Sequence, residues 1–201
     1  MPGGRPRSID LTEAMPIILR LFWHDGYGAS TLEQVASELG VTKPTLCRTL
    51  GEKEAIFSAA LEEYHRVYIA PAEAHLEQAP SLRLALEGVF DVFVERILDD
   101  DVPAGCFIGD SGMSGDFGSG LIADTIGRLQ GGLAARVQQR VIASIAEGEL
   151  LSDSSPSAVV PFILGQFSAL SAISRVRPDK TQLKSVVSYM IAGLPWAVMQ
   201  E

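Results

Sequence analysis

Apolar residues recur at spacings of three and four along most of the chain, and glycines, prolines and polar clusters interrupt them. This spacing is typical of amphipathic helices, whereas strands alternate every second residue. The pattern predicts helices over about residues 10–25, 31–39, 42–50, 52–71, 82–98, 121–147, 158–176 and 180–199. Residues 105–120, which include six glycines, are expected to form a short helix or a mobile loop. No segment reads as a strand, so the sequence predicts an all-α fold of about nine helices.

The segment from Gly26 to Leu61 is the most informative part of the chain. Thr31 is suited to cap a short helix, and Gly40 ends that helix because glycine tolerates left-handed backbone. Thr42 can cap a second helix, with Pro44 in the first turn, where its missing N–H costs least. Two short helices joined by a tight turn are typical of the helix-turn-helix motif, whose second helix enters the DNA major groove. The sequence therefore predicts an N-terminal three-helix DNA-binding unit.

The formal net charge of −9 opposes DNA binding when it is taken alone. The charge is unevenly distributed, however, with −2 in residues 1–66 and −7 in residues 67–201. Several basic residues lie in the N-terminal tail and around the predicted helices over 42–50 and 52–71. The local charge at the motif therefore matters more for DNA binding than the net charge of the chain. We expect DNA affinity that falls steeply with added salt.

Other classes of function lack support in the sequence. No uninterrupted apolar run is long enough to span a membrane, and no signal-peptide core follows the N-terminus, which favours a cytoplasmic protein. Cys47 and Cys106 are far apart and have no metal-ligand spacing, while His65 with Glu62 and the acidic run 99–101 are weak metal candidates. Nucleotide-binding and hydrolase motifs are absent, so we expect neither an enzyme nor a cofactor.

The N-terminal third resembles the TetR family of one-component transcriptional repressors. The matching residues are Phe22, Gly26-Tyr27, Ser30-Thr31, Val35-Ala36, Gly40 to Leu46 and Gly51 to Phe57. The opening Gly4-Arg5-Pro6-Arg7 and the later Gly105-Cys106-Phe107 are similar to one subgroup of this family. The resemblance implies a homodimer that binds double-stranded operator DNA and responds to a small-molecule effector.

Two positions depart from the family pattern. Cys47 stands where a phosphate-contacting tyrosine is usual, so affinity or specificity at the operator can differ from that of relatives. Leu50 stands where an aromatic residue is usual, a change that preserves apolar packing.

Basic and hydroxyl side chains of the motif and the tail are the DNA-contact candidates. Lysines and helix-capping threonines suit phosphates, the recognition-helix side chains suit base edges, and tail arginines suit the minor groove. The candidates are Arg5, Arg7, Thr31, Thr42, Lys43, Thr45, Arg48, Thr49 and Lys53. The threonines can equally serve as caps alone, and Lys53 can be a solvated charge.

The domain prediction is a flexible basic arm over 1–8, a DNA-binding domain over 9–55, and a helical ligand-binding and dimerisation domain over 56–201. Aromatic and sulfur side chains in the last domain are candidates to contact an apolar or amphipathic effector, although each can be plain core. They are Phe90, Phe93, Phe107, Met113, Phe117, Phe162 and Phe167. The stripes on the last two helices predict a dimer interface of Val159, Phe162, Gln166, Leu170, Ile173, Leu183, Val187, Met190 and Ile191.

The sequence therefore favours a ligand-responsive repressor that an effector releases from a palindromic operator. One alternative is a helical small-molecule-binding protein or enzyme that retains the helix-turn-helix only as scaffold. A thiol sensor is another, because oxidation of Cys47 in a recognition helix would disturb DNA contact.

Overall fold

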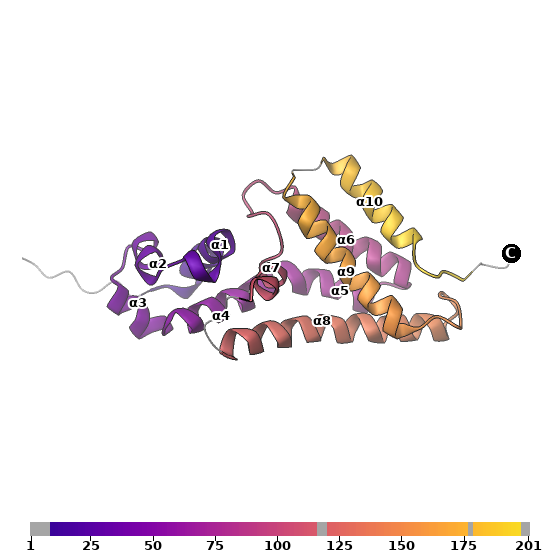
Figure 1. Ribbon diagram of the computed structural model, residues 1–201, viewed down its shortest axis with the longest axis horizontal. Coiled ribbons are helices and arrows are strands. Elements are labelled where there is room, and N and C mark those ends of the chain that lie inside the picture. Colours follow the sequence, from indigo (N-terminus) through magenta and orange to yellow (C-terminus); the bar gives the residue numbers. More distant parts are fainter. Residues whose placement is uncertain (1–8, 116–119, 177–178, 198–201) are drawn as a thin grey trace, which may run out of the picture. The chain divides into compact units, whose positions relative to one another are not determined.

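The computed structural model describes residues 9–115, 120–176 and 179–197, and the helices dominate it (Figure 1). The elements are α1 (Leu11–Ala29), α2 (Leu32–Glu38), α3 (Lys43–Leu50), α4 (Lys53–Tyr64), the π-helical η1 (His65–Ile69), α5 (Ala70–Gln78), α6 (Leu82–Ile97), α7 (Phe107–Ser114), α8 (Gly120–Ala146), α9 (Pro156–Ser174) and α10 (Lys180–Ala192). Extended pairing in these ranges is limited to one isolated bridge between Leu150 and Trp196. The prediction of an all-α fold is confirmed.

The chain forms two compact units. The first unit comprises Met1–His65 and Phe107–Leu129, and the second comprises Arg66–Cys106 and Gln130–Glu201. The first unit thus includes α7 and the first part of α8 as well as the N-terminal helices. The functional boundary between residues 55 and 56 stays a prediction.

An aromatic cluster centred on Phe57 forms the core of the first unit. The Phe57 ring meets the rings of Phe22, Tyr27 and Phe107 edge-on, at centroid distances of 5.0, 5.2 and 5.1 Å. Phe22 and Tyr27 come from α1, and Phe107 comes from α7. Edge-to-face packing adds to the gain from burying apolar area, so this cluster fixes α1 and α7 against α4.

The second unit has its own core, in which α6 packs against α5 and α10. Leu82 and Leu86 of α6 are fully buried, and Leu183 of α10 joins the same apolar cluster. The α9 helix is long and apolar enough to cross a membrane by length and composition, with a mean hydropathy of 1.5 over 18 residues. Only 28% of that window is buried, although Val159, Ile163 and Leu170 pack into the core.

Two predicted helix ends differ from the structure. The helix that Pro71 was expected to kink or end is interrupted before that residue: α4 ends at Tyr64, the π-helical η1 follows, and Pro71 lies in the first turn of α5, where a missing N–H breaks no helical hydrogen bond. The last helix ends at Ala192 and not near residue 199, since Pro195 follows and cannot continue it. The chain then folds back, with Leu151 N–H donating to Pro195 O at 2.9 Å and Trp196 Nε1–H donating to Ile191 O at 2.8 Å.

A pair of glycine substitutions tests the backbone assignment of the first unit. Gly40 has φ of 63° with open space around its Cα, so Gly40→Ala introduces backbone strain and no clash. We expect Gly40→Ala to lower the free energy of unfolding by about 1 kcal/mol. Gly127 lies inside α8 with equally open space, so Gly127→Ala is expected to raise the free energy of unfolding by about 0.5–1 kcal/mol. Urea unfolding followed by circular dichroism measures both free energies. Changes of the same sign in the two variants would contradict the assigned backbone conformations of Gly40 and Gly127.

Candidate nucleic-acid interface

The first helix of the motif, α2, begins in a reciprocal capping box. The Thr31 hydroxyl accepts the Gln34 backbone N–H at 3.2 Å, and the Gln34 carboxamide oxygen accepts the Thr31 N–H at 2.8 Å. This arrangement satisfies two donors that a helix start leaves unpaired. It fixes where α2 begins and how the chain enters the motif.

Gly40 ends α2 and begins the turn to α3, as the sequence predicts. Gly40 adopts left-handed backbone, and Val41 N–H donates to Ala36 O at 2.9 Å, which closes the end of α2. Thr42 then caps α3, its hydroxyl accepting the Thr45 N–H at 3.3 Å, and Pro44 lies in the first turn. The predicted helix-turn-helix is therefore present in detail.

The position of α3 is set by its one fully buried side chain, Leu46. The turn also places Leu32, Val35 and Ala36 of α2 inside the unit. With Leu46 directed inward, Arg48 lies on the opposite face of α3, and Lys43 and Thr49, one turn before and after Leu46, are also exposed to solvent. A short helix held by one apolar anchor, with a basic and hydroxyl-rich outer face, suits insertion into a groove of DNA.

The two departures from the family pattern are both partly buried. Cys47 and Leu50 lie on α3 at intermediate exposure, and neither Cys47 nor Cys106 forms a disulfide. Leu50 precedes Gly51, whose φ of 88° allows the chain to leave α3 toward α4. Redox sensing by Cys47 stays a prediction.

Lys53 at the start of α4 has a partner within the first unit. Its Nζ lies 4.3 Å from the centroid of the Tyr27 ring, a distance at which an ammonium is attracted to the aromatic face. This contact fixes the side chain beside α1 in the unbound protein. Its predicted contact with a DNA phosphate is not tested by the structure.

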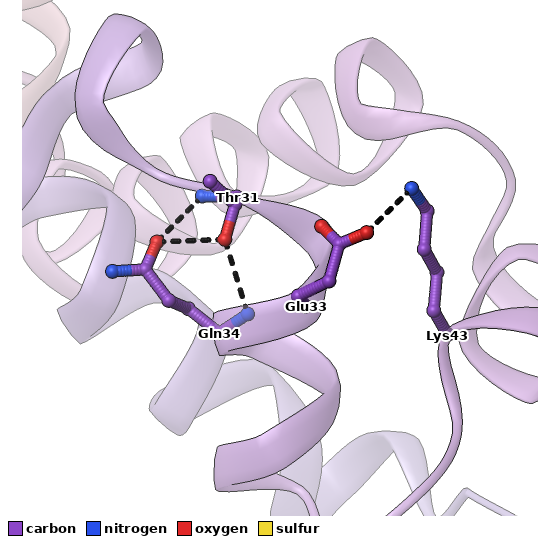
Figure 2. Close-up of polar contacts among 4 residues, drawn as sticks. All are labelled: Thr31, Glu33, Gln34 and Lys43. Carbon is purple, nitrogen blue, oxygen red and sulfur yellow. Dashed lines mark hydrogen bonds and ion pairs between the residues drawn. The ribbon is translucent and has the colours of Figure 1, made fainter.

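The polar side chains at the starts of α2 and α3 contact one another (Figure 2). Lys43 Nζ donates to Glu33 Oε1 at 2.8 Å, and the Thr31 hydroxyl donates to Gln34 Oε1 at 2.9 Å. The hydrogen bond from Lys43 lowers the pKa of the Glu33 carboxyl, and the same carboxylate raises the pKa of Lys43. Glu33 is not among the residues predicted from the sequence, although it lies in the first turn of α2, ten residues before the lysine that starts α3.

The remaining threonines of α3 are engaged locally. The Thr49 hydroxyl donates to the Thr45 carbonyl oxygen at 2.9 Å, and the Thr42 and Thr45 hydroxyls lie 3.0 Å apart. Thr31 and Thr42 thus act as helix caps, and their contact with DNA stays a prediction. Arg5 and Arg7 lie outside the described residues.

Part of the predicted effector-contact set comes together in the second unit. Phe167 of α9 lies against both Phe90 and Phe93 of α6, at centroid distances of 5.0 and 5.5 Å. Phe107 instead packs in the first unit against Phe57 and Tyr64. Met113 and Phe162 are 72% and 41% exposed, and Phe117 lies outside the described residues. Effector contact by any of them stays a prediction.

Most of the predicted dimer residues are buried within the second unit itself. Only Phe162 of this set is strongly exposed, while Gln166 and Ile173 are partly buried. The fully packed members are Val159, Leu170, Leu183, Val187, Met190 and Ile191. The core of the single chain therefore uses much of the apolar faces of α9 and α10. A contact of these helices with a second copy stays a prediction.

The Gly105-Cys106-Phe107 element begins at a tightly held peptide. Gly105 has φ of 94°, its carbonyl oxygen accepts from Arg96 Nη1 at 2.8 Å, and its N–H donates to the Ser174 hydroxyl at 3.1 Å. Arg96 is itself buried, and its guanidinium lies 4.2 Å from the Phe93 ring centroid. These contacts join α6 to the end of α9 at the residue before Cys106.

Among the described residues, no group of three His, Cys, Asp or Glu side chains is placed to hold a metal ion. In the acidic run 99–101, Asp99 Oδ1 accepts the Asp101 N–H at 2.9 Å, which is a local turn contact.

The capped α2–α3 pair with its exposed polar face is the candidate functional site of the first unit. It defines a helix-turn-helix DNA-binding protein.

Comparisons with known proteins agree with this class. Residues 18–60 match the family model described as bacterial regulatory proteins, tetR family, and residues 84–190 match the tetracyclin repressor-like C-terminal domain. The chain is 31% identical over 148 residues to the HTH-type transcriptional repressor ComR of Escherichia coli strain K12, covering 73% of this chain and 70% of ComR. It is 23% identical over 192 residues to the uncharacterized regulator YezE of Bacillus subtilis strain 168, covering 95% and 99% of the two chains.

A solved structure extends the likeness over nearly the whole fold. A cysteine-substituted form of the TetR family regulator CifR, complexed with 26-base-pair operator DNA, is 25% identical, with a TM-score of 0.85. The match covers 96% of this chain and 100% of CifR. The chain belongs to the TetR family, and the prediction of a DNA-binding transcriptional regulator is confirmed. Ligand-responsive repression is typical of this family, whose members are regulators and not enzymes.

Truncation of the α3 anchor tests how the recognition helix is held. Leu46→Ala is expected to lower the free energy of unfolding by about 2–5 kcal/mol, because a fully buried leucine leaves a cavity. Thr49→Ala on the exposed face of α3 is the control and is expected to change it by less than about 1 kcal/mol. Chemical denaturation measures both, and similar values for the two variants would contradict the assigned orientation of α3.

Proposed function

We propose that this protein is a dimeric cytoplasmic repressor that binds a palindromic operator through α3. A small apolar or amphipathic effector, bound in the second unit, releases the protein from the DNA. The exposure of Lys43, Arg48 and Thr49 on α3, while Leu46 of the same helix is fully buried, is the observation that carries the proposal. ComR, which is named a repressor, and the operator complex of CifR support the same direction.

Arg48 is the residue we assign to base reading. An exposed guanidinium on the outer face of a recognition helix can donate two parallel hydrogen bonds to guanine O6 and N7. Lys43 and Lys53 are assigned to phosphates, which position the protein without reading sequence. Because a tyrosine is absent at Cys47, these three side chains supply more of the affinity than in relatives that retain it.

Dimer formation supplies the geometry that a palindrome requires. Two recognition helices must reach major-groove sites separated by about 34–36 Å. The α9 helix offers the apolar surface for this, since only 28% of its apolar window is buried in the single chain and Phe162 is 41% exposed. A second copy that covered α9 and α10 would bury this surface around a two-fold axis.

The Phe90, Phe93 and Phe167 cluster is the place we assign to the effector. These rings lie between α6 and α9, and clefts between helices are the usual sites for small ligands in bundles. An effector inserted there would favour a conformer whose α3 helices no longer match successive major grooves.

The operator test uses fluorescence anisotropy with palindromic duplexes from the upstream region of the protein's own gene. Arg48→Ala is expected to weaken specific binding by about 1–3 kcal/mol and to relax specificity at one base position. Arg83→Ala removes the same charge from the second unit and serves as control. Wild-type binding that depends on neither sequence nor salt would contradict the proposed repressor and favour a helix-turn-helix kept only as scaffold.

The dimer test uses sedimentation equilibrium. Phe162→Glu places a charge on the exposed face of α9 and is expected to weaken self-association on the order of tenfold or more. Ile142→Glu is the matched control, because Ile142 on α8 is also about half exposed, at 49%. A monomeric wild-type protein, or equal effects of the two substitutions, would contradict the α9 interface.

A further inference from the structure

The polar groups at the DNA-facing helix starts already have partners in the unbound protein. Both donors of Thr31, its N–H and its hydroxyl, point to Gln34 Oε1, at 2.8 and 2.9 Å. The ammonium of Lys43 points to Glu33 Oε1 at 2.8 Å. Figure 2 shows two separate contacts at the start of α2, one between Thr31 and Gln34 and one between Glu33 and Lys43. The acceptors therefore come from one helix, α2.

Glu33 offers Lys43 the same chemistry as a phosphate oxygen does. Both are anionic oxygens that accept a charge-assisted hydrogen bond from an ammonium at about 2.8 Å. One Lys43 side chain cannot give its full interaction to both at once, so a DNA phosphate must compete with Glu33. A glutamate carboxyl is ionised at neutral pH, and the hydrogen bond from Lys43 lowers the pKa of Glu33 further, so an anionic oxygen faces Lys43.

The pair is also easy to open. The side chains of Lys43 and Glu33 are 48% and 65% exposed, so separating them leaves no buried charge without a partner. Exposed ion pairs of this kind contribute little to folding stability. The contact can therefore affect DNA binding without serving as a structural support of the motif.

We infer that Glu33 is an internal phosphate competitor that sets the affinity of this protein for the DNA backbone. The inference rests on the proposed DNA contact of Lys43. By occupying Lys43, Glu33 lowers affinity for every duplex by a similar factor, because phosphate contacts carry no sequence information. Weak backbone affinity reduces retention at the many non-specific sites of a genome, so the base contacts of α3 decide where the protein remains bound.

Removal of the competing carboxylate should tighten DNA binding. Glu33→Gln keeps the shape of the side chain and should strengthen binding to both an upstream palindromic duplex and a random-sequence duplex by about three- to fivefold. Fluorescence anisotropy of the full chain across a salt series measures this, with melting temperature as a check on folding. Glu38→Gln removes the same charge from the exposed C-terminal end of α2 and should change affinity less.

A double-mutant cycle separates the ion pair from general repulsion between Glu33 and DNA. In a Lys43→Gln background, Glu33→Gln should give no more gain than Glu38→Gln gives. A weaker or unchanged affinity for Glu33→Gln, or the same gain with and without Lys43, would overturn the inference. Equal wild-type affinity for random and upstream duplexes would count against the proposed operator function alone, while absence of binding to either duplex would contradict both.

Discussion

The burial of Phe57 is the interaction on which the DNA-reading unit depends. Its ring packs edge-to-face with those of Phe22 and Tyr27 from α1 and of Phe107 from α7, so one side chain of α4 connects its own helix to two others. The short helices α2 and α3 are too brief to be stable alone, and they keep their geometry only when the surrounding helices form a rigid frame. Tyr27 also holds Lys53 through its ring face, which links this apolar core to the charged surface.

Electrostatics decide how a protein with a net charge of −9 can serve as a DNA-binding regulator. The relevant charges are few and are placed locally, on the outer face of α3 and at the start of α4. Lys43 is shared with Glu33 in the unbound protein, and Lys53 is held by an aromatic ring. Because both cations already have partners, the proposed contacts of Lys43 and Lys53 with DNA would be an exchange of partners and not the simple neutralisation of free charges. In the proposed function such an exchange would give moderate backbone affinity, which suits a regulator that an effector releases from its operator.

The sequence predicted the N-terminal motif well because local rules fix it. Thr31, Gly40 and Thr42 act through bonds and backbone angles within a few residues, so their roles follow from the chain order. The ends of later helices were less predictable. The α-helix that begins with α4 ends at Tyr64, well before Pro71, and the chain turns back after Ala192, where Pro195 O accepts from Leu151 N–H, a contact between segments far apart in the sequence.

By itself, the sequence determined the all-α class, the helix-turn-helix and the basic and hydroxyl residues that this motif carries. Helical periodicity and capping are short-range effects, and they can be read without knowing which helices meet. Only the tertiary structure decided that Phe107 packs with Phe57, that Phe167 packs with Phe90, and that Glu33 holds Lys43. The same apolar stripe can face a core, a ligand or a second copy, and a charge can face solvent or a partner. Long-range packing alone distinguishes these outcomes.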